Sequence, residues 1–175
     1  GSYDGQNKTI DGLYINRPQE DDIGLFGEVG NTTIRNLNLT NADITGNDRT
    51  GVLIGSVQDS GQTMVEDCST NGSVFGKNYV GGLIGINFGQ FYITNSHNEA
   101  DIQGEESVGG LVGYTSGAPE IVTCSNTGDV HANASDDSRA GGLVGYSEFV
   151  ATVSDSSNQG TVSGNGDYIG GLIGY

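Results

Sequence analysis

The sequence predicts an all-β protein: a parallel β-solenoid (β-helix-like) of about six rungs with a repeat of ~29 residues. Three observations predict it. A short apolar anchor of the form Gly-Leu-x-Gly recurs every 28 to 32 residues, a half-polar segment lies between most copies, and no window shows the 3.6-residue period of an amphipathic helix. Because one such unit is too small to close a core, the copies must stack to bury their apolar side chains.

The anchor has two apolar residues at its centre in every copy, which begin at residues 24, 52, 82, 110, 142 and 171. Neighbouring side chains of a regular strand point to opposite faces. We therefore expect an anchor strand that is covered on both faces, as in buried parallel sheets. The alternatives are a Gly-Gly bulge that redirects one of the two side chains, and a second column exposed as a partner-binding stripe. Glycine is expected where the backbone bends sharply, takes positive φ or approaches a neighbour closely, and only Val52 departs from this pattern.

Between anchors, small or apolar residues alternate with polar ones. The regular copies span residues 65–76, 93–104, 121–132 and 153–164, and a divergent copy at 34–46 has one extra residue. This period of two predicts a strand with one face in water. One inward column contains Asn98, Asn126 and Asn158, which we expect to hydrogen-bond from rung to rung.

The two cysteines fall in one inward column but two rungs apart. At ~4.8 Å per rung, Cys68 and Cys124 are ~9.6 Å from each other. A disulfide requires Cα atoms within ~7 Å. We therefore expect two unpaired thiols that face the core.

The composition excludes several classes of partner. With 6 basic and 22 acidic residues the net charge is −16, which excludes a nucleic-acid binder and argues against docking on an anionic membrane. No apolar run approaches the ~20 residues that span a bilayer, so no membrane insertion of this segment is expected. The acidic residues gather in the turns before the anchors, where Arg49, Lys77 and Arg139 would relieve their repulsion. Surface calcium is the alternative, but no calcium-loop motif supports it.

No catalytic motif is recognisable in the sequence. It lacks the His-Glu-x-x-His, Gly-x-Ser-x-Gly and phosphate-loop patterns. The two histidines, His97 and His131, fall in different polar columns and are expected at the surface. We predict no catalytic residue, no metal site and no cofactor in this segment.

The residue that follows the anchor is tyrosine in the last three copies, Tyr114, Tyr146 and Tyr175. These tyrosines are predicted to stack along the rod. Aromatic faces with hydroxyl rims suit the recognition of sugars or proteins, so the three are the candidate ligand-binding residues. The alternative is an intramolecular aromatic ladder that stabilises the stack.

The repeated Gly-Leu-x-Gly, with a partner strand such as residues 93–104, resembles the GLUG-motif repeats of bacterial surface and secreted proteins. Residues 4–10 and 12–18 look like the leading rung that precedes such repeats, so the resemblance covers nearly the whole chain. GLUG repeats occur in adhesin-like proteins and in non-catalytic regions of bacterial immunoglobulin A metallopeptidases. The resemblance implies a parallel β-solenoid displayed outside the cell and implies no activity.

We expect residues 1–175 to form one repeat domain, a fragment of a longer chain because the sequence ends directly after an anchor. The predicted function is a non-catalytic structural and adhesive module, secreted or on the surface of a bacterium. It would display its surface to a host or matrix protein or a glycan. The alternatives are a carbohydrate-binding module and an accessory segment of a secreted metallopeptidase.

Overall fold

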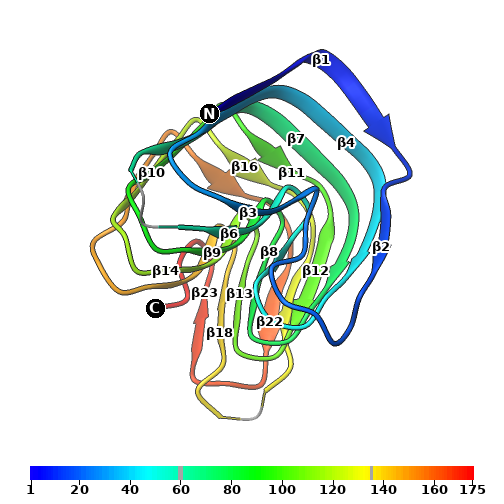
Figure 1. The fold of residues 1–175 in the computed structure, drawn as a ribbon. Helices are drawn as coiled ribbons and strands as arrows, with labels where there is room; N and C mark the ends of the chain where they lie inside the picture. Colours follow the sequence, from blue (N-terminus) through cyan, green and yellow to red (C-terminus); the bar gives the residue numbers. More distant parts are fainter. Residues whose placement is uncertain (59–60, 135) are drawn as a thin grey trace.

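The structure, a computed structural model, describes residues 1–58, 61–134 and 136–175. The described residues form 23 strands and no helix, so none of them belongs to a helix that could cross a membrane. All strand pairs are parallel, and each strand pairs with its equivalent about one repeat away: Ile93, for example, lies between Val65 and Ile121. Figure 1 looks nearly along the stack, so that β6, β9 and β14 follow one another in depth. The predicted parallel β-solenoid of about six rungs is confirmed.

Three sheets, here called A, B and C, enclose the core. Sheet A is the long curved sheet that runs along the outer side of the coil in Figure 1. Its strands are β1 (Ser2–Asp11), β2 (Tyr14–Asn16), β4 (Thr33–Thr45), β7 (Thr63–Phe75), β10 (Phe91–Thr94), β11 (His97–Asn98), β12 (Asp101–Gly104), β15 (Pro119–Val122), β16 (Ser125–Asn126), β17 (Val130–Ala132), β20 (Thr152–Ser154), β21 (Ser157–Asn158) and β22 (Val162–Gly164).

Sheets B and C are short, and the chain passes from A to B to C in each repeat. Sheet B contains β5 (Thr50–Gly51), β8 (Tyr79–Gly81), β13 (Ser107–Gly109), β18 (Arg139–Gly141) and β23 (Tyr168–Gly170). Sheet C contains β3 (Phe26–Val29), β6 (Ile54–Val57), β9 (Ile84–Asn87), β14 (Val112–Thr115) and β19 (Val144–Ser147). The two short sheets meet at an angle that points toward sheet A, which leaves a re-entrant angle on the outside (Figure 1).

Sheet A bends at one residue of each rung, and this bend was not predicted. The residues there have φ between 48° and 56°, in the left-handed region. They are Asn36, Asp67, Asn95, Thr123 and Asp155. Asparagine and aspartate tolerate this conformation because their short side chains bond locally, whereas a β-branched residue adopts it rarely.

The expectation of one continuous partner strand holds for β4 and β7 and is wrong for the last three rungs. There the bend divides the segment into three short strands, such as β10, β11 and β12. The predicted alternation is confirmed beyond the bend, since Asn98 and Ile102 are buried and His97 and Asp101 are exposed. The extra residue of the divergent copy is accommodated as a bulge between Leu39 and Ala42.

The burial of both anchor columns is confirmed, but the predicted anchor strand is wrong. Leu83 and Ile84 each have 0% of their surface exposed. Leu83 lies in the bend between β8 and β9, and only Ile84 belongs to a strand. Because the chain turns from sheet B to sheet C within the anchor, two adjacent side chains reach the same core. An exposed apolar stripe is therefore absent from the inner rungs that the structure describes.

The anchor glycines permit a close approach between backbones. A Cβ on Gly109 of sheet B would overlap the carbonyl oxygen of Val112, and one on Gly113 of sheet C would lie 2.5 Å from the amide nitrogen of Val80. Equivalent glycines recur in each rung and form a seam along the line where sheets B and C meet. Among the described glycines, positive φ occurs at Gly12, Gly61 and Gly72, all of which lie outside the anchors. Close approach, rather than a left-handed backbone, therefore explains the repeated glycines.

The predicted asparagine ladder is confirmed. The Nδ2 of Asn98 donates to Oδ1 of Asn126 at 2.7 Å, and the Nδ2 of Asn126 donates to Oδ1 of Asn158 at 2.8 Å. Each Nδ2 also donates to a backbone carbonyl two residues further on. Buried amides with satisfied partners stabilise one register, because a slipped rung would leave them unpaired.

The ladder also accounts for the anchor that lacks its first glycine. A Cβ on Gly82 would overlap the side-chain amide of Asn98. Val52 aligns with Gly82, since Gly51 pairs with Gly81 and Ile54 with Ile84. In that rung the ladder position is the shorter Thr70, which donates to Oδ1 of Asn98 at 2.8 Å. A valine in the anchor thus coincides with a smaller ladder residue.

The two cysteines are buried and unpaired, as predicted. Burial raises the pKa of the Cys68 thiol to about 11 and also raises the pKa of Cys124. In the same column, Ser96 accepts a hydrogen bond from the amide of Cys68 at 3.2 Å. The thiols act here as small core side chains and not as nucleophiles.

We predict that Leu111→Ala costs about 2–5 kcal/mol of unfolding free energy, because the side chain is fully buried at the centre of the leucine column. Urea titration followed by circular dichroism measures it. The matched control is Leu172→Ala, in the same column but 42% exposed, which should cost less than about 1 kcal/mol. Equal losses at the two positions would contradict the assignment of the core.

We predict that Asn126→Ala lowers the unfolding free energy by about 1–3 kcal/mol, because it breaks both rung-to-rung bonds of the ladder inside the core. Thr127→Ala, at the exposed neighbouring position, should change it by less than about 0.5 kcal/mol. The same urea titration measures both, and an Asn126→Ala protein as stable as the parent would mean that the ladder does not stabilise the stack.

Candidate functional site

The predicted tyrosine stack lies in the outer angle between sheets B and C. The ring centroids of Tyr114 and Tyr146 are 5.3 Å apart, and those of Tyr146 and Tyr175 are also 5.3 Å apart. Two tyrosines from sheet B complete it: Tyr79 lies 5.0 Å from Tyr114, and Tyr168 lies 4.7 Å from Tyr175. The predicted stacking along the rod is confirmed, and the stack contains five tyrosines where the sequence predicted three.

Arg139 and Glu148 hold the stack from its edges. The guanidinium of Arg139 lies 4.6 Å from the ring centroid of Tyr146 and within 6 Å of two further rings. Such an arrangement is attractive because the ring faces carry negative potential. The hydroxyl of Tyr114 donates to Oε1 of Glu148. The neighbours of Tyr114 and Tyr146 thus cover much of their rings, which favours the intramolecular ladder, while ligand binding by Tyr114, Tyr146 and Tyr175 stays a prediction.

Sequence reasoning missed Tyr79, Tyr168 and Arg139 as members of this cluster. Each is the first residue of a sheet B strand and stands three residues before its anchor. Comparing the residues that stand three positions before each anchor would have identified them from the sequence. The angle between the sheets could not be read in this way, and it is the angle that brings the sheet B column against the sheet C column.

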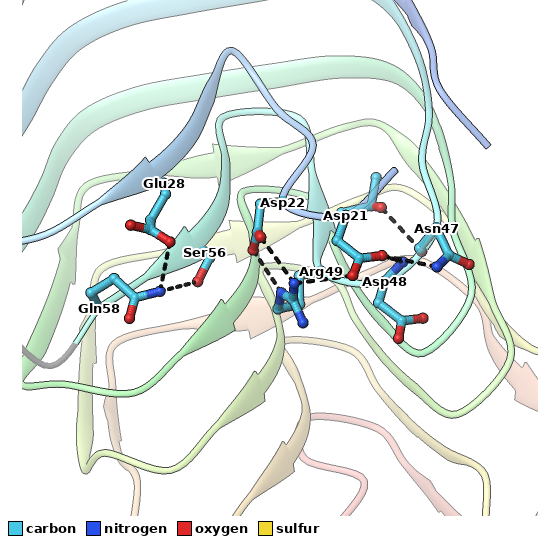
Figure 2. Close-up of polar contacts among 9 residues, drawn as sticks. Asp21, Asp22, Glu28, Asn47, Asp48, Arg49, Ser56 and Gln58 are labelled. Carbon is cyan, nitrogen blue, oxygen red and sulfur yellow. Dashed lines mark hydrogen bonds and ion pairs between the residues drawn. The ribbon is translucent and has the colours of Figure 1, made fainter. Parts of the chain in front are cut away.

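In the first rungs the outer positions of the same angle carry charged and polar side chains, and Figure 2 shows their contacts. Arg49 donates to Asp22 through Nε at 2.6 Å and Nη2 at 2.9 Å, and Nη2 also reaches Asp21 at 3.1 Å. Nearby, the amide of Gln58 donates to Glu28 at 3.0 Å and to Ser56 at 3.1 Å. The predicted relief of acidic repulsion by an interleaved base is confirmed for Arg49.

The carboxylate of Asp21 is held in its charged form. Partial desolvation works against this, but hydrogen bonds from Asn47 and the amide of Asp48, with the charge of Arg49, lower its pKa from the ordinary value. All three partners come from the turn of the next rung. The ion pairs therefore join successive rungs at the acidic end of the angle, although partly exposed pairs of this kind contribute little each.

The two histidines contact serines of the neighbouring rungs. Nδ1 of His97 lies 2.9 Å from Oγ of Ser125, and Nδ1 of His131 lies 2.8 Å from Oγ of Ser163. His97 is exposed as predicted, whereas His131 is half-buried. Within residues 1–58, 61–134 and 136–175, no three His, Cys, Asp or Glu side chains are grouped to hold a metal ion.

Comparison with known proteins identifies the repeat. The family described as the GLUG motif matches residues 104–130 and 136–163, which cover most of the third and fourth regular strand segments. The chain contains a GLUG-repeat region. Halomucin of Haloquadratum walsbyi is 40% identical over 86 residues, which are 49% of this chain and 1% of Halomucin.

The fold of this chain also resembles a solved structure. That protein is described as a candidate immunoglobulin A1 protease from Bacteroides ovatus. The two folds agree with a TM-score of 0.75 at 20% sequence identity, over 98% of this chain and 55% of the solved chain. This chain therefore spans a small part of Halomucin and about half of the solved protein, and the structural likeness shows a shared fold.

We predict that alkaline pH destabilises the folded chain through Tyr114. Burial, and then the hydrogen bond to Glu148, raise the pKa of this phenol above its ordinary value. Above pH ~10 the unfolded chain loses the phenolic proton while the folded chain retains it, so this contribution to stability is present below pH ~10 and declines above it. Urea titrations at pH 8 and pH 11 should show a smaller decline for Tyr114→Phe than for the parent.

Tyr14→Phe is the control for this measurement, since Tyr14 is 67% exposed and lies outside the stack. It should leave the decline unchanged. Tyr79, whose pKa is raised by burial and then by Glu106 and Asp48, accounts for part of what remains in Tyr114→Phe. A Tyr114→Phe protein that declines as steeply as the parent would contradict the role assigned to this hydroxyl.

Proposed function

We propose that this chain is a non-catalytic extracellular repeat module, a structural and adhesive rod that displays its surface to host or matrix partners. The observation that carries the proposal is the stacking of GLUG-type repeats into one coil with a core that continues from rung to rung. A stack of this kind gains length by adding rungs and needs no other domain to close its core. It holds its outer faces at fixed spacing, which suits repeated weak contacts with a partner.

The relatives support a place outside the cell. One is named Halomucin and the other is described as a candidate immunoglobulin A1 protease, and from these names we infer a location outside the cell for this chain. The acidic surface supports the same role, because a net charge of −16 opposes self-association and non-specific binding to anionic polymers. A protein or a glycan of the host or matrix is the class of partner that we propose.

Within this function the tyrosine stack stiffens the rod. Tyr114 and Tyr146 are half-buried between neighbouring rings, whereas Tyr175 is 58% exposed. Of the three candidate ligand-binding residues, Tyr175 is the one with most surface to offer a partner.

A second candidate is an accessory segment of a secreted protease, favoured by the likeness over 98% of this chain to the candidate immunoglobulin A1 protease. A His-Glu-x-x-His motif elsewhere in the parent gene would support it, because this motif supplies the zinc ligands and general base of such enzymes. A parent gene without a peptidase motif would remove it.

Surface display is tested with antibodies raised against residues 1–175. We expect intact cells that produce the parent protein to bind the antibody, and brief protease treatment of these cells to abolish the signal. A cytoplasmic protein measured in the same samples should survive the treatment. Antibody binding that appears only after lysis would overturn the proposed function.

A further inference from the structure

The outer face of sheet A carries a shallow hollow of about 240 Å³, on a different sheet from the tyrosine stack of sheets B and C. It crosses three successive rungs, at β7, β12 and β17, and we call it the sheet A trough. Its outward-pointing side chains include Phe75, Asp101, Gln103, Asp129 and His131. Of these groups, His131 contacts Ser163 of the next rung, whereas the ring of Phe75 takes no part in the architecture described above.

Phe75 is the unusual member of the trough. It is 49% exposed and stands in a column whose other members are small or polar, between Thr45 on one side and Gln103 on the other. The threonine shows that this position does not need a large apolar residue for packing. An exposed ring beside polar groups offers a flat apolar platform with hydrogen-bonding partners at its edge.

The polar wall of the trough retains hydrogen-bonding capacity. Oδ1 of Asp101 accepts from the amide of Asp129 at 3.0 Å, and Oδ1 of Asp129 accepts from the amide of Thr161 at 2.8 Å. These backbone bonds fix both carboxylates. In the part of the chain that the structure describes, Oδ2 of each carries no hydrogen bond from the protein. Gln103, which is exposed, stands in backbone register with His131, and its side-chain amide completes the wall.

We propose that the sheet A trough binds a neutral saccharide, whose ring packs its C–H face on Phe75 and donates hydroxyl groups to Asp101 and Asp129. A sugar ring presents an apolar face with hydroxyls at its edge, which matches a ring flanked by fixed acceptors and an amide. The net charge of −16 opposes sulfated or otherwise anionic glycans. A wholly apolar ligand would desolvate the carboxylates without giving them partners.

A second hollow extends the surface available to a chain of sugars. It lies on the same sheet across neighbouring rungs, has a volume of about 490 Å³ and is lined mainly by hydroxyl and amide groups such as those of Asn38, Thr40 and Asn71. Because Ser73 of the trough lies two residues beyond Asn71 on β7, an oligosaccharide can reach both.

This assignment rests on the proposed display function, since it names a ligand class for the displayed surface. Different experiments nevertheless test the saccharide site and the display function, so either can be disproved without the other. Binding is measured on the purified chain and display on intact cells. A displayed chain that binds no saccharide removes only the trough, and a chain that binds saccharide but stays inside the cell removes only the display.

The test is an array of neutral and anionic oligosaccharides probed with the labelled 175-residue chain, followed by calorimetry with the neutral glycan that binds best. We expect Phe75→Thr to weaken binding by about tenfold. Asp101→Asn, which keeps an oxygen for the amide of Asp129, should cause a smaller loss. The matched control is Tyr14→Thr, an exposed aromatic residue on the same sheet outside the trough, which should bind as the parent does.

Three results would overturn the assignment. They are an array on which no neutral glycan binds, affinity that Phe75→Thr leaves unchanged, and equal losses for Phe75→Thr and Tyr14→Thr. Urea titration of each variant separates lost binding from lost folding. Binding of basic peptides at the trough in place of saccharides would also count against it.

Discussion

The seam of glycines where sheets B and C meet is the constraint on which the rest of this structure depends. Side chains normally keep two sheets about 10 Å apart. Here Gly109 and Gly113 lack the Cβ atoms that would collide with the facing backbone, so the two sheets touch main chain to main chain. The chain can then turn sharply within the anchor, and adjacent residues such as Leu83 and Ile84 both enter the core. Repeating this turn in each rung builds the coil.

The same turn creates the outer angle and therefore decides what fills it. Glycines at the apex leave no side chains there, so residues further from the apex must cover the exposed backbone. In later rungs Tyr79, Tyr114 and Tyr146 do so by stacking. In the first rungs Asp22 and Arg49 do so by pairing charges. The tyrosine stack and the ion pairs thus both cover the backbone that the glycines leave exposed at the apex. Tyrosine at a fixed distance after the anchor therefore indicates this architecture more directly than it indicates a ligand.

Much of this arrangement could be predicted from the sequence because a solenoid repeats its contacts at the period of its sequence. The recurrence of the anchors gave the stacking direction, the alternation from Cys68 to Val74 gave the inward column, and Asn98 and Asn126 in one column gave the ladder. The features that could not be predicted are those that depend on the angles at which consecutive strands and sheets meet. The left-handed bend at Asn95 and the turn at Leu83 are single-residue events, which period-two alternation does not report. The meeting of Arg139 with Tyr146 follows from those angles.

The distribution of structural roles around the coil indicates where binding is most readily accommodated. The inner columns bury the core and the asparagine ladder, and the angle between sheets B and C is occupied by the tyrosine stack and the ion pairs, so changes there alter stability. The outward columns of sheet A have no sheet packed over them, and their side chains contact neighbouring rungs at the surface, as where Asp101 accepts a hydrogen bond from the amide of Asp129. A residue such as Phe75, which is exposed at 49% in such a column, carries a cost in exposed apolar surface that the fold does not recover. A ligand that covers the ring would remove this exposed apolar surface from water, and this difference between the faces, more than any single contact, favours sheet A as the face for the proposed saccharide site.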